Sequence, residues 1–349
     1  MVIFGQKLKK KIFMNNINCK IVADSINSFG NRIITFELIY PRIIHAEVMT
    51  HRLFSRNASS SRAVPVNKMI EAVRNNMFTP LAIQKAHKGM QGSEYFEGDE
   101  LVQAKQLWIE SAELALQQAE KMEKFGITKQ LINRILEPYQ YYKVLITATE
   151  FDNFFSLRCP AYTSDKGEVF KSRKYFIKTK NTSEEGFHYP CSDLGWLKIN
   201  KGQSEIHIMQ LAECMWDAMN ESTPKQLQAG EYHIPYGDTI NVLGDTDFKE
   251  DVLTKIKIAT ARCARVSYTT VGEDSKEIPY EKDIALHDSL IASGHMSPTE
   301  HIARAMSDEE YESFIKGTIT NNVEKGWTGV KGIGWCNNFR GFIQYRYMI

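Results

Sequence analysis

Strand-like and helix-like stretches are interleaved along this chain, which predicts a protein of the α/β (α+β) class. Residues 32–40, RIITFELIY, and residues 143–149, KVLITAT, are short and rich in β-branched side chains, as strands are. Between them, residues 99–124 repeat apolar side chains at helical spacing and are followed by Gly126. This pattern indicates an amphipathic helix with one face on a core.

The other expected elements follow from the same periodicities and from prolines and glycines at their ends. Pro41 can begin a helix directly after the first strand. Pro138 and Pro160 end two further helices, and Gly294 has the place of a C-terminal cap. Residues 162–203 are charged and aperiodic, so we expect a loop-rich insertion there. The remaining expected elements are helices over 128–136, 150–158, 204–219 and 284–294, a strand over 255–270, and an alternating aromatic tail.

Composition restricts the class of protein. The chain has 349 residues, with 43 Lys and Arg against 42 Asp and Glu, which argues against a protein that coats DNA or RNA. No apolar run is long enough to span a bilayer, and the start does not resemble a signal peptide. Six cysteines without a C-x-x-C pair are typical of reduced thiols in a cytoplasmic protein. We expect a single domain over residues 1–349, without a membrane or nucleic-acid partner.

Two alternatives for the cysteines are weaker than burial as small apolar residues. His188 and Cys191 have an H-x-x-C spacing with Cys159 upstream, but a zinc site would need further ligands from unpaired positions. Cys159 follows Arg158 and could be a thiolate nucleophile, although no histidine partner is evident nearby. We therefore expect no metal site and no covalent nucleophile.

Residues 41–62, PRIIHAEVMTHRLFSRNASSSR, are the most informative stretch of the chain. A helix-compatible apolar run leads into a segment dense in arginines, serines and an asparagine, with almost no nearby acid. Guanidinium and hydroxyl donors match the oxygens of a phosphate. A solvated Ser-rich loop with incidental arginines explains the same stretch equally well.

Three further pieces carry groups suited to a binding site. They are Asn133 to Leu136 at a helix end, Asp152 to Arg158 on a short helix, and residues 294–301, GHMSPTEH. Each has a structural alternative, since arginines at helix C-termini complement the helix dipole. Residues 297–300, SPTE, match a capping box with Ser297 as the N-cap, which leaves His295 and His301 unexplained.

Together these pieces resemble the flavin-dependent thymidylate synthases. Residues 50–60 resemble the family's R-H-R, seven residues, S signature, followed by Ser61-Arg62 in place of its G-R. The remaining matches are 134–138 (RILEP) to R-x-V-L-P, 153–158 (NFFSLR) to N-F-x-x-L-R, 294–301 (GHMSPTEH) to G-H-x-[ST]-P-x-E-H, and 264–268 (ARVSY) to A-R-V-x-Y.

The order of these motifs differs from the family's. Family members begin with the A-R-V and H-x-S-P-x-E-H blocks, which here follow L-R, so the resemblance implies a circularly permuted single catalytic domain. It covers most of the chain, except for the 162–203 insertion and both ends. The family fold is a mainly antiparallel curved sheet flanked by helices, assembled as a homotetramer with active sites between subunits.

The resemblance implies a methyltransferase that converts dUMP to dTMP. Methylenetetrahydrofolate would supply the carbon, and FAD reduced by NADPH would supply the hydride. Arg158 would lie at the uracil edge and make C5 nucleophilic. Ser60, Arg62 and Arg134 would hold the nucleotide, the two arginines at its phosphate. The implied site residues are Arg158 and Ser60 for catalysis; Glu47, Ser60, Ser61, Arg62, Arg134 and Arg158 for dUMP; and His51, Arg52, Asn57, Asn153, His295, Ser297 and Glu300 for flavin and folate.

The chain departs from the family pattern at two motif positions. Thr50 replaces the first arginine of R-H-R, which removes a charge from the flavin region, and Ala58 stands where the family often has Glu. These departures leave two alternatives open. The first is a dUMP 5-hydroxymethylase on the same scaffold, and the second is a nucleotide-binding protein that has kept the fold without redox chemistry.

Overall fold

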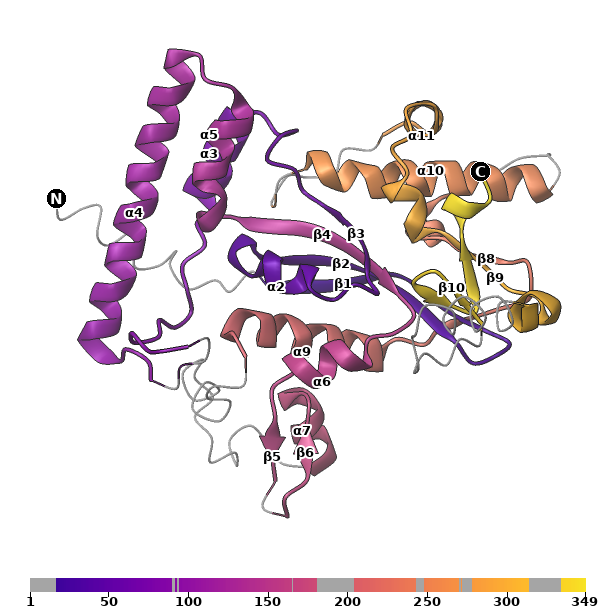
Figure 1. Ribbon diagram of the computed structural model, residues 1–349, viewed down its shortest axis with the longest axis horizontal. Coiled ribbons are helices and arrows are strands. Elements are labelled where there is room, and N and C mark those ends of the chain that lie inside the picture. Colours follow the sequence, from indigo (N-terminus) through magenta and orange to yellow (C-terminus); the bar gives the residue numbers. More distant parts are fainter. Residues whose placement is uncertain are drawn as a thin grey trace, which may run out of the picture.

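The computed structural model describes residues 17–89, 92, 94–164, 166–180, 204–242, 248–269, 271, 278–313 and 334–349 (Figure 1). Its centre is a five-stranded sheet in the order β3-β4-β2-β1-β7. All neighbouring strands are antiparallel except β1 and β7, which run parallel, so the sheet is mainly antiparallel, as expected. The strands are β1 (Asn18–Asn27), β2 (Arg32–Pro41), β3 (Ser55–Ala58), β4 (Tyr141–Ala148) and β7 (Lys225–Leu227).

β1 and β2 form a hairpin, and the turn between them sets how these two strands pair. The Asn27 side chain accepts the backbone N–H groups of Phe29 (3.1 Å) and Asn31 (2.9 Å), and Gly30 takes the positive φ that the turn requires. β2 is the expected strand 32–40. It lies in the middle of the sheet with structure on both faces, so side chains on both of its faces are buried.

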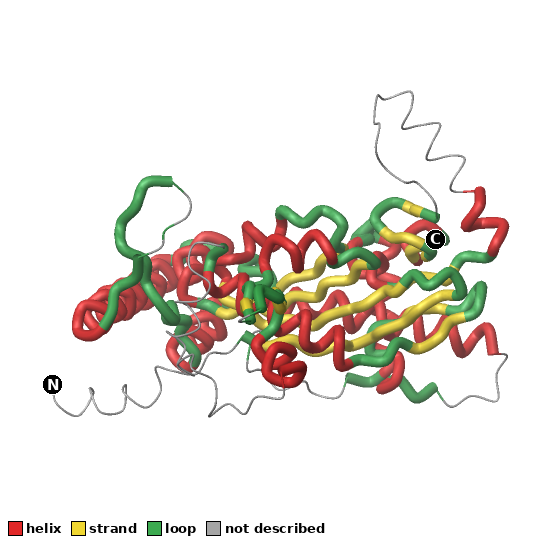
Figure 2. The backbone as a smooth tube through the Cα atoms, turned by 90° about the horizontal axis from the view of Figure 1, so that it is seen from below, coloured by secondary structure: helices red, strands yellow, loops and turns green. Residues whose placement is uncertain are grey.

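Figure 2 shows helices on both sides of the sheet. One face is covered by α6 (Asp152–Arg158) and α9 (Ile206–Glu221), which confirm two expected helices. Their apolar faces pack on β2 and β4 through a core that includes Phe36, Ile146, Phe154, Leu211 and Met215. This core fixes the end of α6, where Arg158 lies.

The opposite face carries α10 (Phe248–Arg265), α11 (Tyr280–Ala292) and a small antiparallel sheet in the order β12-β9-β8. A second core of Leu145, Ile256, Ile302 and Tyr345 joins these elements to the central sheet. The other elements of this layer are β8 (Tyr232–His233), η4 (Gly237–Thr239), η5 (Val266–Tyr268), η6 (Ser297–His301), β9 (Ala303–Ala305), β10 (Trp335–Cys336), β11 (Phe339–Arg340), β12 (Phe342–Gln344) and η7 (Tyr345–Tyr347).

A third layer of helices lies beside the β3–β4 end of the sheet (Figure 1). It consists of α3 (Val66–Asn75), α4 (Gly98–Phe125) and α5 (Lys129–Leu136), whose packed faces include Ile70, Leu116 and Ile132. α4 is the expected long helix, and it ends at Gly126 in the left-handed conformation. Thr128 caps α5, after which η2 (Glu137–Tyr139) leads into β4.

The expected strand over 255–270 is wrong, because this segment forms the second half of α10 and then η5. Its β-branched residues favour a strand locally. However, Ile256, Ala259 and Cys263 recur at helical spacing and are buried together. Packing of this face outweighs the local propensity.

The expected loop-rich insertion is only partly described. Within it, β5 (Tyr162–Thr163) pairs with β6 (Val169–Phe170), and α7 (Arg173–Lys180) follows. Phe170 and Phe176 are buried against α9, so this part is ordered by a small apolar core. Residues 181–203, including His188 and Cys191, lie outside the described residues. Among the residues that are described, no group of three possible metal ligands occurs.

Two local expectations are corrected at their residues. Ser297 makes no capping hydrogen bond, and residues 297–301 form the 3-10 helix η6 rather than a capped α-helix. The Glu300 carboxylate is instead ion-paired with Arg346. Cys159 is buried, and burial raises the pKa of its thiol to about 12, so it is a small apolar residue and not an activated nucleophile. None of the described helices is long and apolar enough to cross a membrane.

Candidate functional site

The stretch 41–62 begins as a helix, as the sequence predicts, and then becomes an edge strand. η1 (Arg42–Ile44) and α2 (His45–Met49) follow β2, and β3 then pairs with β4. Strand alternation buries Ser55 and Asn57 while leaving Arg56 and Ala58 half-buried. The serine-rich loop starts where β3 ends. We call residues 59–64 the serine loop.

The serine loop is fixed by bonds to three other elements. The Ser59 N–H donates to the Lys143 carbonyl (2.9 Å), and the Ser60 N–H donates to the Ser267 carbonyl (3.0 Å). From α5, the buried Asn133 amide donates to the carbonyls of Ser61 (2.7 Å) and Val64 (2.8 Å). The backbone of the loop is therefore held in one conformation, which is not the behaviour of a solvated linker.

The serine loop and α5 bring one predicted group of residues together. Ser60 is half-buried, Arg62 and Arg134 are exposed, and Ser61 is buried. The cavity directly behind the loop measures only about 20 Å³. That space holds one water and no nucleotide. A phosphate would therefore have to bind on the open side, where the arginines lie.

A second group forms around Arg158 at the end of α6. The Arg158 Nε–H donates to Nε2 of His51 (3.4 Å), and its Nη1–H donates to Oγ of Ser204 (3.1 Å). The His51 ring packs edge-on against Phe154, with ring centroids 4.8 Å apart, and stacks with Phe54 at 5.7 Å. Two residues far apart in the sequence, which the resemblance assigns to cofactor and substrate, are thus in direct contact.

Among the residues that the structure describes, no neighbour compensates the charge of Arg158. Burial, and then the positive charges of Arg158 and Arg56, lower the pKa of His51 to about 4, so its imidazole is neutral at neutral pH. A neutral imidazole can accept the Arg158 hydrogen bond. Within the described residues, no carboxylate lies at ion-pair distance from Arg158 and no hydrogen bond joins it to Arg62 or Arg134. The half-buried cation is therefore available to an anionic or electron-rich ligand.

Arg56 connects this region with the 294–301 segment. Its Nη1–H groups donate to the carbonyls of Met49 (2.9 Å) and His51 (3.4 Å), which fixes the turn between α2 and β3. Burial lowers the pKa of Arg56, and the Glu300 carboxylate opposes that shift. η6 packs against β3, so Glu300 lies near the His51 region although its ion pair is with Arg346.

The remaining predicted residues differ in their exposure to solvent. Arg52, Asn153, His295 and Ser297 are exposed on three separate elements. Asn57 is buried and its amide donates to the Cys263 carbonyl (3.2 Å), which is a structural contact with α10.

The predicted residue Glu47 and the motif position Thr50 lie at the C-terminal end of α2. The Thr50 hydroxyl donates to the Glu47 carbonyl (2.6 Å) and closes the C-terminal end of α2. It therefore has a local structural function, and it supplies no charge at the position of the family's first arginine. Glu47 itself is half-buried, and its Oε2 is shielded from solvent without a hydrogen-bond partner among the described residues.

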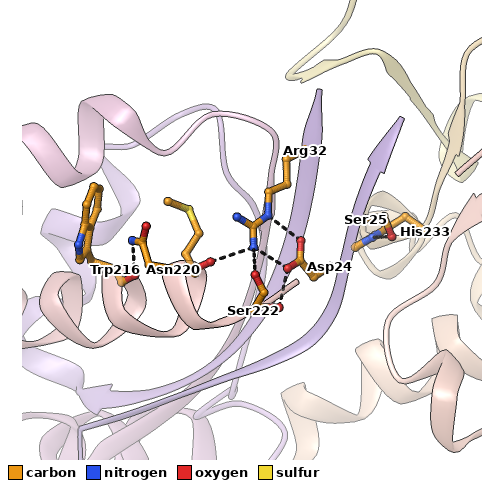
Figure 3. Close-up of polar contacts among 8 residues, drawn as sticks. Asp24, Ser25, Arg32, Trp216, Asn220, Ser222 and His233 are labelled. Atoms are coloured by element: carbon orange, nitrogen blue, oxygen red, sulfur yellow. Dashed lines mark hydrogen bonds and ion pairs between the residues drawn. The ribbon is translucent and has the colours of Figure 1, made fainter. Parts of the chain in front are cut away.

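The otherwise unexplained His301 belongs to a buried chain of hydrogen bonds that crosses the sheet. His301 Nδ1 bonds to the Thr147 hydroxyl (2.7 Å), which bonds to the Thr35 hydroxyl (2.7 Å). Thr35 bonds to Nε2 of His233 (2.8 Å), whose Nδ1 bonds to the Ser25 hydroxyl (2.9 Å). We call these five residues the buried polar chain. Figure 3 shows its outer end, where Ser25 and His233 meet beside the Asp24–Arg32 ion pair.

Sequence reasoning missed three residues that position these groups. Ser204 is the described residue that follows the insertion, and its contact with Arg158 depends on how α9 packs under α6. Asn133 was part of a quoted motif, but only its burial shows that it holds the serine loop. Arg56 was seen as one of several arginines, and no sequence pattern predicts its bonds to backbone carbonyls.

Comparison with known proteins gives a distant structural likeness. No family model and no curated protein matches the sequence. Two solved structures of the UMP/dUMP methylase PolB from Streptomyces cacaoi are similar, one bound with 5-Br UMP and one with 5-Br dUMP. Their sequence identities are 16% and 15% and their TM-scores 0.41 and 0.40. Each alignment covers 60% of this chain and 90% or 91% of the other. No residue of this chain is assigned a role from this likeness.

Proposed function

We propose that this chain is a flavin-dependent methyltransferase that converts dUMP to dTMP, with methylenetetrahydrofolate as the carbon donor and NADPH as the reductant. The motif resemblance supplies the reaction, and the arrangement of Arg158 supports it. This proposal includes the circularly permuted catalytic domain and the homotetramer that the resemblance implies.

The observation that carries the proposal is the charge of Arg158, which no carboxylate among the described residues compensates. Its guanidinium is oriented by two neutral acceptors, His51 and Ser204, and keeps N–H groups for a ligand. Methylation at C5 requires negative charge to develop on the pyrimidine ring. A fixed cation at a uracil carbonyl stabilises that charge without having to reorganise, which is how an enzyme lowers such a barrier.

The phosphate of dUMP would lie at the corner of the serine loop. Arg62 and Arg134 are exposed there, and Ser60 has a half-buried hydroxyl on the same loop. Arginine forks favour phosphate oxygens, and the fixed backbone of the loop limits the entropy lost on binding. Ser60 and Arg158 remain the proposed catalytic pair, with Ser60 at the nucleotide.

The residues predicted for flavin fit that group only in part. Arg52, Asn153, His295 and Ser297 are exposed and could donate to a large polar cofactor. By contrast, Asn57 is committed to a backbone carbonyl, and Glu300 and His51 are in contact with Arg346 and Arg158. FAD, when bound, would supply the hydride. The residues of this chain would orient the nucleotide and hold charge at its ring.

One product assay distinguishes the proposal from its alternatives. Purified protein, reconstituted with FAD, is incubated with dUMP tritiated at C5, methylenetetrahydrofolate and NADPH, and tritium release and nucleotide mass are measured. We expect tritium release that requires both cosubstrates, and a product with the mass of dTMP. A hydroxymethyl product would favour the hydroxymethylase. A colourless protein that binds dUMP but neither FAD nor folate would contradict the enzyme.

A further inference from the structure

Two cysteines from distant parts of the chain are in contact between the central sheet and α9. Cys19 lies near the start of β1, and Cys214 lies in the middle of α9, which packs on β1 (Figure 1). Both are half-buried free thiols. The Cys19 thiol donates a hydrogen bond to the sulfur of Cys214, and the Cys19 backbone N–H donates to the same sulfur. The proposed dUMP reaction uses neither residue.

The two sulfurs are held in place by the elements that carry them. Cys19 is paired with Leu38 of β2, and both side chains lie on the face of the sheet that α9 covers, because directly opposed residues share a face. On α9, Leu211 and Met215 are close to Cys214 in the sequence and are fully buried in the same core. Packing of α9 on the sheet therefore brings the two cysteines together, and their contact does not depend on a loop.

The contact makes the two thiols differ in acidity. The hydrogen bond from Cys19 lowers the pKa of Cys214, because it stabilises the thiolate. Burial, and then the neighbouring sulfur, raise the pKa of Cys19. Burial also raises the pKa of the other described cysteines, which are Cys159, Cys263 and Cys336. Among the described cysteines, Cys214 is therefore the one most readily converted to a nucleophilic thiolate, and a second thiol is in contact with it.

We propose that Cys19 and Cys214 form a reversible disulfide when the protein meets a hydroperoxide. The Cys214 thiolate attacks one peroxide oxygen, which gives a sulfenic acid and releases hydroxide, and this hydroxide takes up the proton that the thiol lost. The Cys19 thiol then attacks the oxidised sulfur, the S–S bond forms and water leaves. Two thiols and one hydrogen peroxide thus give one disulfide and two waters, so the thiols are oxidised and the peroxide is reduced.

The disulfide would join α9 covalently to the central sheet. It would close a long loop of chain, which restricts the unfolded state and so stabilises the folded one. A small-molecule thiol would reverse the modification, because its thiolate attacks the disulfide. The inference does not depend on the proposed methyltransferase activity, since neither cysteine is among the residues proposed to bind dUMP, flavin or folate.

Mass spectrometry of the full-length protein tests the site. Reduced, folded protein is treated with a small molar excess of hydrogen peroxide and digested without reduction. We expect a loss of mass equal to two hydrogen atoms, a cross-linked peptide that joins Cys19 to Cys214, and recovery of the original mass after dithiothreitol. Cys336→Ser removes another half-buried thiol and is the matched control, which should keep the cross-link. Cys191→Ser should also keep it, because the bond needs no cysteine from outside the described residues.

Single variants test the order of the two steps. In Cys19→Ser the sulfenic acid at Cys214 has no thiol to attack it, so dimedone should label Cys214. In Cys214→Ser, dimedone should label Cys19 at least about tenfold less, because that thiol is rarely ionised. Circular dichroism checks that each variant is folded, and Cys19→Ala or Cys214→Ala replaces a serine variant that is not.

Thermal unfolding tests whether the two cysteines are placed for the bond. Oxidation should raise the unfolding midpoint of the unaltered protein by about 3 °C or more and leave that of Cys214→Ser unchanged. An unchanged or lowered midpoint in the unaltered protein would mean that the bond distorts the fold. That result, the absence of the cross-link, a cross-link that forms only in denaturant, or stronger labelling in Cys214→Ser than in Cys19→Ser would each overturn the proposal.

Discussion

Two histidines of this protein lie in contrasting surroundings. His51 sits at the edge of the Arg158 region and accepts a hydrogen bond from a cation. His301 is fully buried and bonds to the neutral hydroxyl of Thr147. The pKa of His51 is lowered by burial together with two arginines, whereas that of His301 is lowered chiefly by burial, with a smaller contribution from His233. Both imidazoles are neutral at neutral pH, for different reasons.

The difference between these surroundings shows which polar groups are available for function. In the buried polar chain, Ser25, His233, Thr35, Thr147 and His301 each have a partner inside the protein, so these hydrogen bonds stabilise the fold, although Nε2 of His301 has no partner among the described residues. In the Arg158 region, two neutral acceptors orient a cation and leave its charge uncompensated among the described residues. A charge held in this way destabilises the empty site and favours a bound anion.

Substitution of Arg158 should give the largest effect on activity and little effect on stability. We expect Arg158→Ala to lower kcat by about 10²- to 10³-fold, because it removes the charge that stabilises the transition state. FAD binding should be largely intact, as measured by the flavin spectrum. Arg158→Lys keeps the charge without the fork and should be intermediate. Arg74→Ala, at an exposed arginine of α3 outside the proposed site, is the control.

Loss of flavin from Arg158→Ala would mean that Arg158 belongs to the cofactor site. A normal kcat would remove the basis of the proposed mechanism. In either case, the Arg158 region could no longer be assigned to catalysis while the buried polar chain is assigned to stability.

Substitution in the buried polar chain should do the reverse. Thr147→Val keeps the shape of the side chain but leaves Nδ1 of His301 without a partner and removes one of the two partners of Thr35, at a cost of about 1–3 kcal/mol in the free energy of unfolding. Chemical denaturation measures this loss. The double variant with Thr35→Val should lose less than the sum of the two single variants, because both remove the same bond. Additive losses would show that the two hydroxyls are not coupled.

The sequence predicted helices and strands correctly where the spacing of apolar residues agreed with the glycines and prolines at the ends of the element. The strand 32–40, the long helix before Gly126 and the helix ending before Pro160 were all confirmed as β2, α4 and α6. It failed at α10, where β-branched residues lie on a helix whose apolar face is buried. It also failed at Ser297, because Glu300 is taken by Arg346, a residue close to the C-terminus.

The candidate site could be predicted only as a list of residues. The family resemblance implied that His51 and Arg158 belong to one active site, and the two residues are in contact in the structure. Spacing could not predict Ser204 or the buried polar chain, since these contacts join residues more than forty positions apart through tertiary packing. The permutation, the tetramer and the flavin residues stay predictions.

Acid should produce the smallest effect, through the two histidines of the buried polar chain and, with a similar slope, through His51. The pKa values of His233 and His301 are lowered to about 3 by burial, below the value of about 6.5 in an unfolded chain. Their contribution to stability is thus complete above pH 6.5 and is lost progressively as the pH falls toward 3. Each should cost about 1 kcal/mol of unfolding free energy between pH 6.5 and 5.5.

Matched variants assign this slope to the buried polar chain. His301→Asn keeps an amide N–H near the Nδ1 position for Thr147 but cannot titrate in this range, so denaturation curves measured against pH should lose about 1 kcal/mol of the fall between pH 6.5 and 5.5. His295→Asn removes an exposed imidazole and should leave the slope unchanged. A slope unaffected by His301→Asn would mean that acid acts elsewhere. In that case, protonation of the buried histidines would not explain the loss of stability in acid.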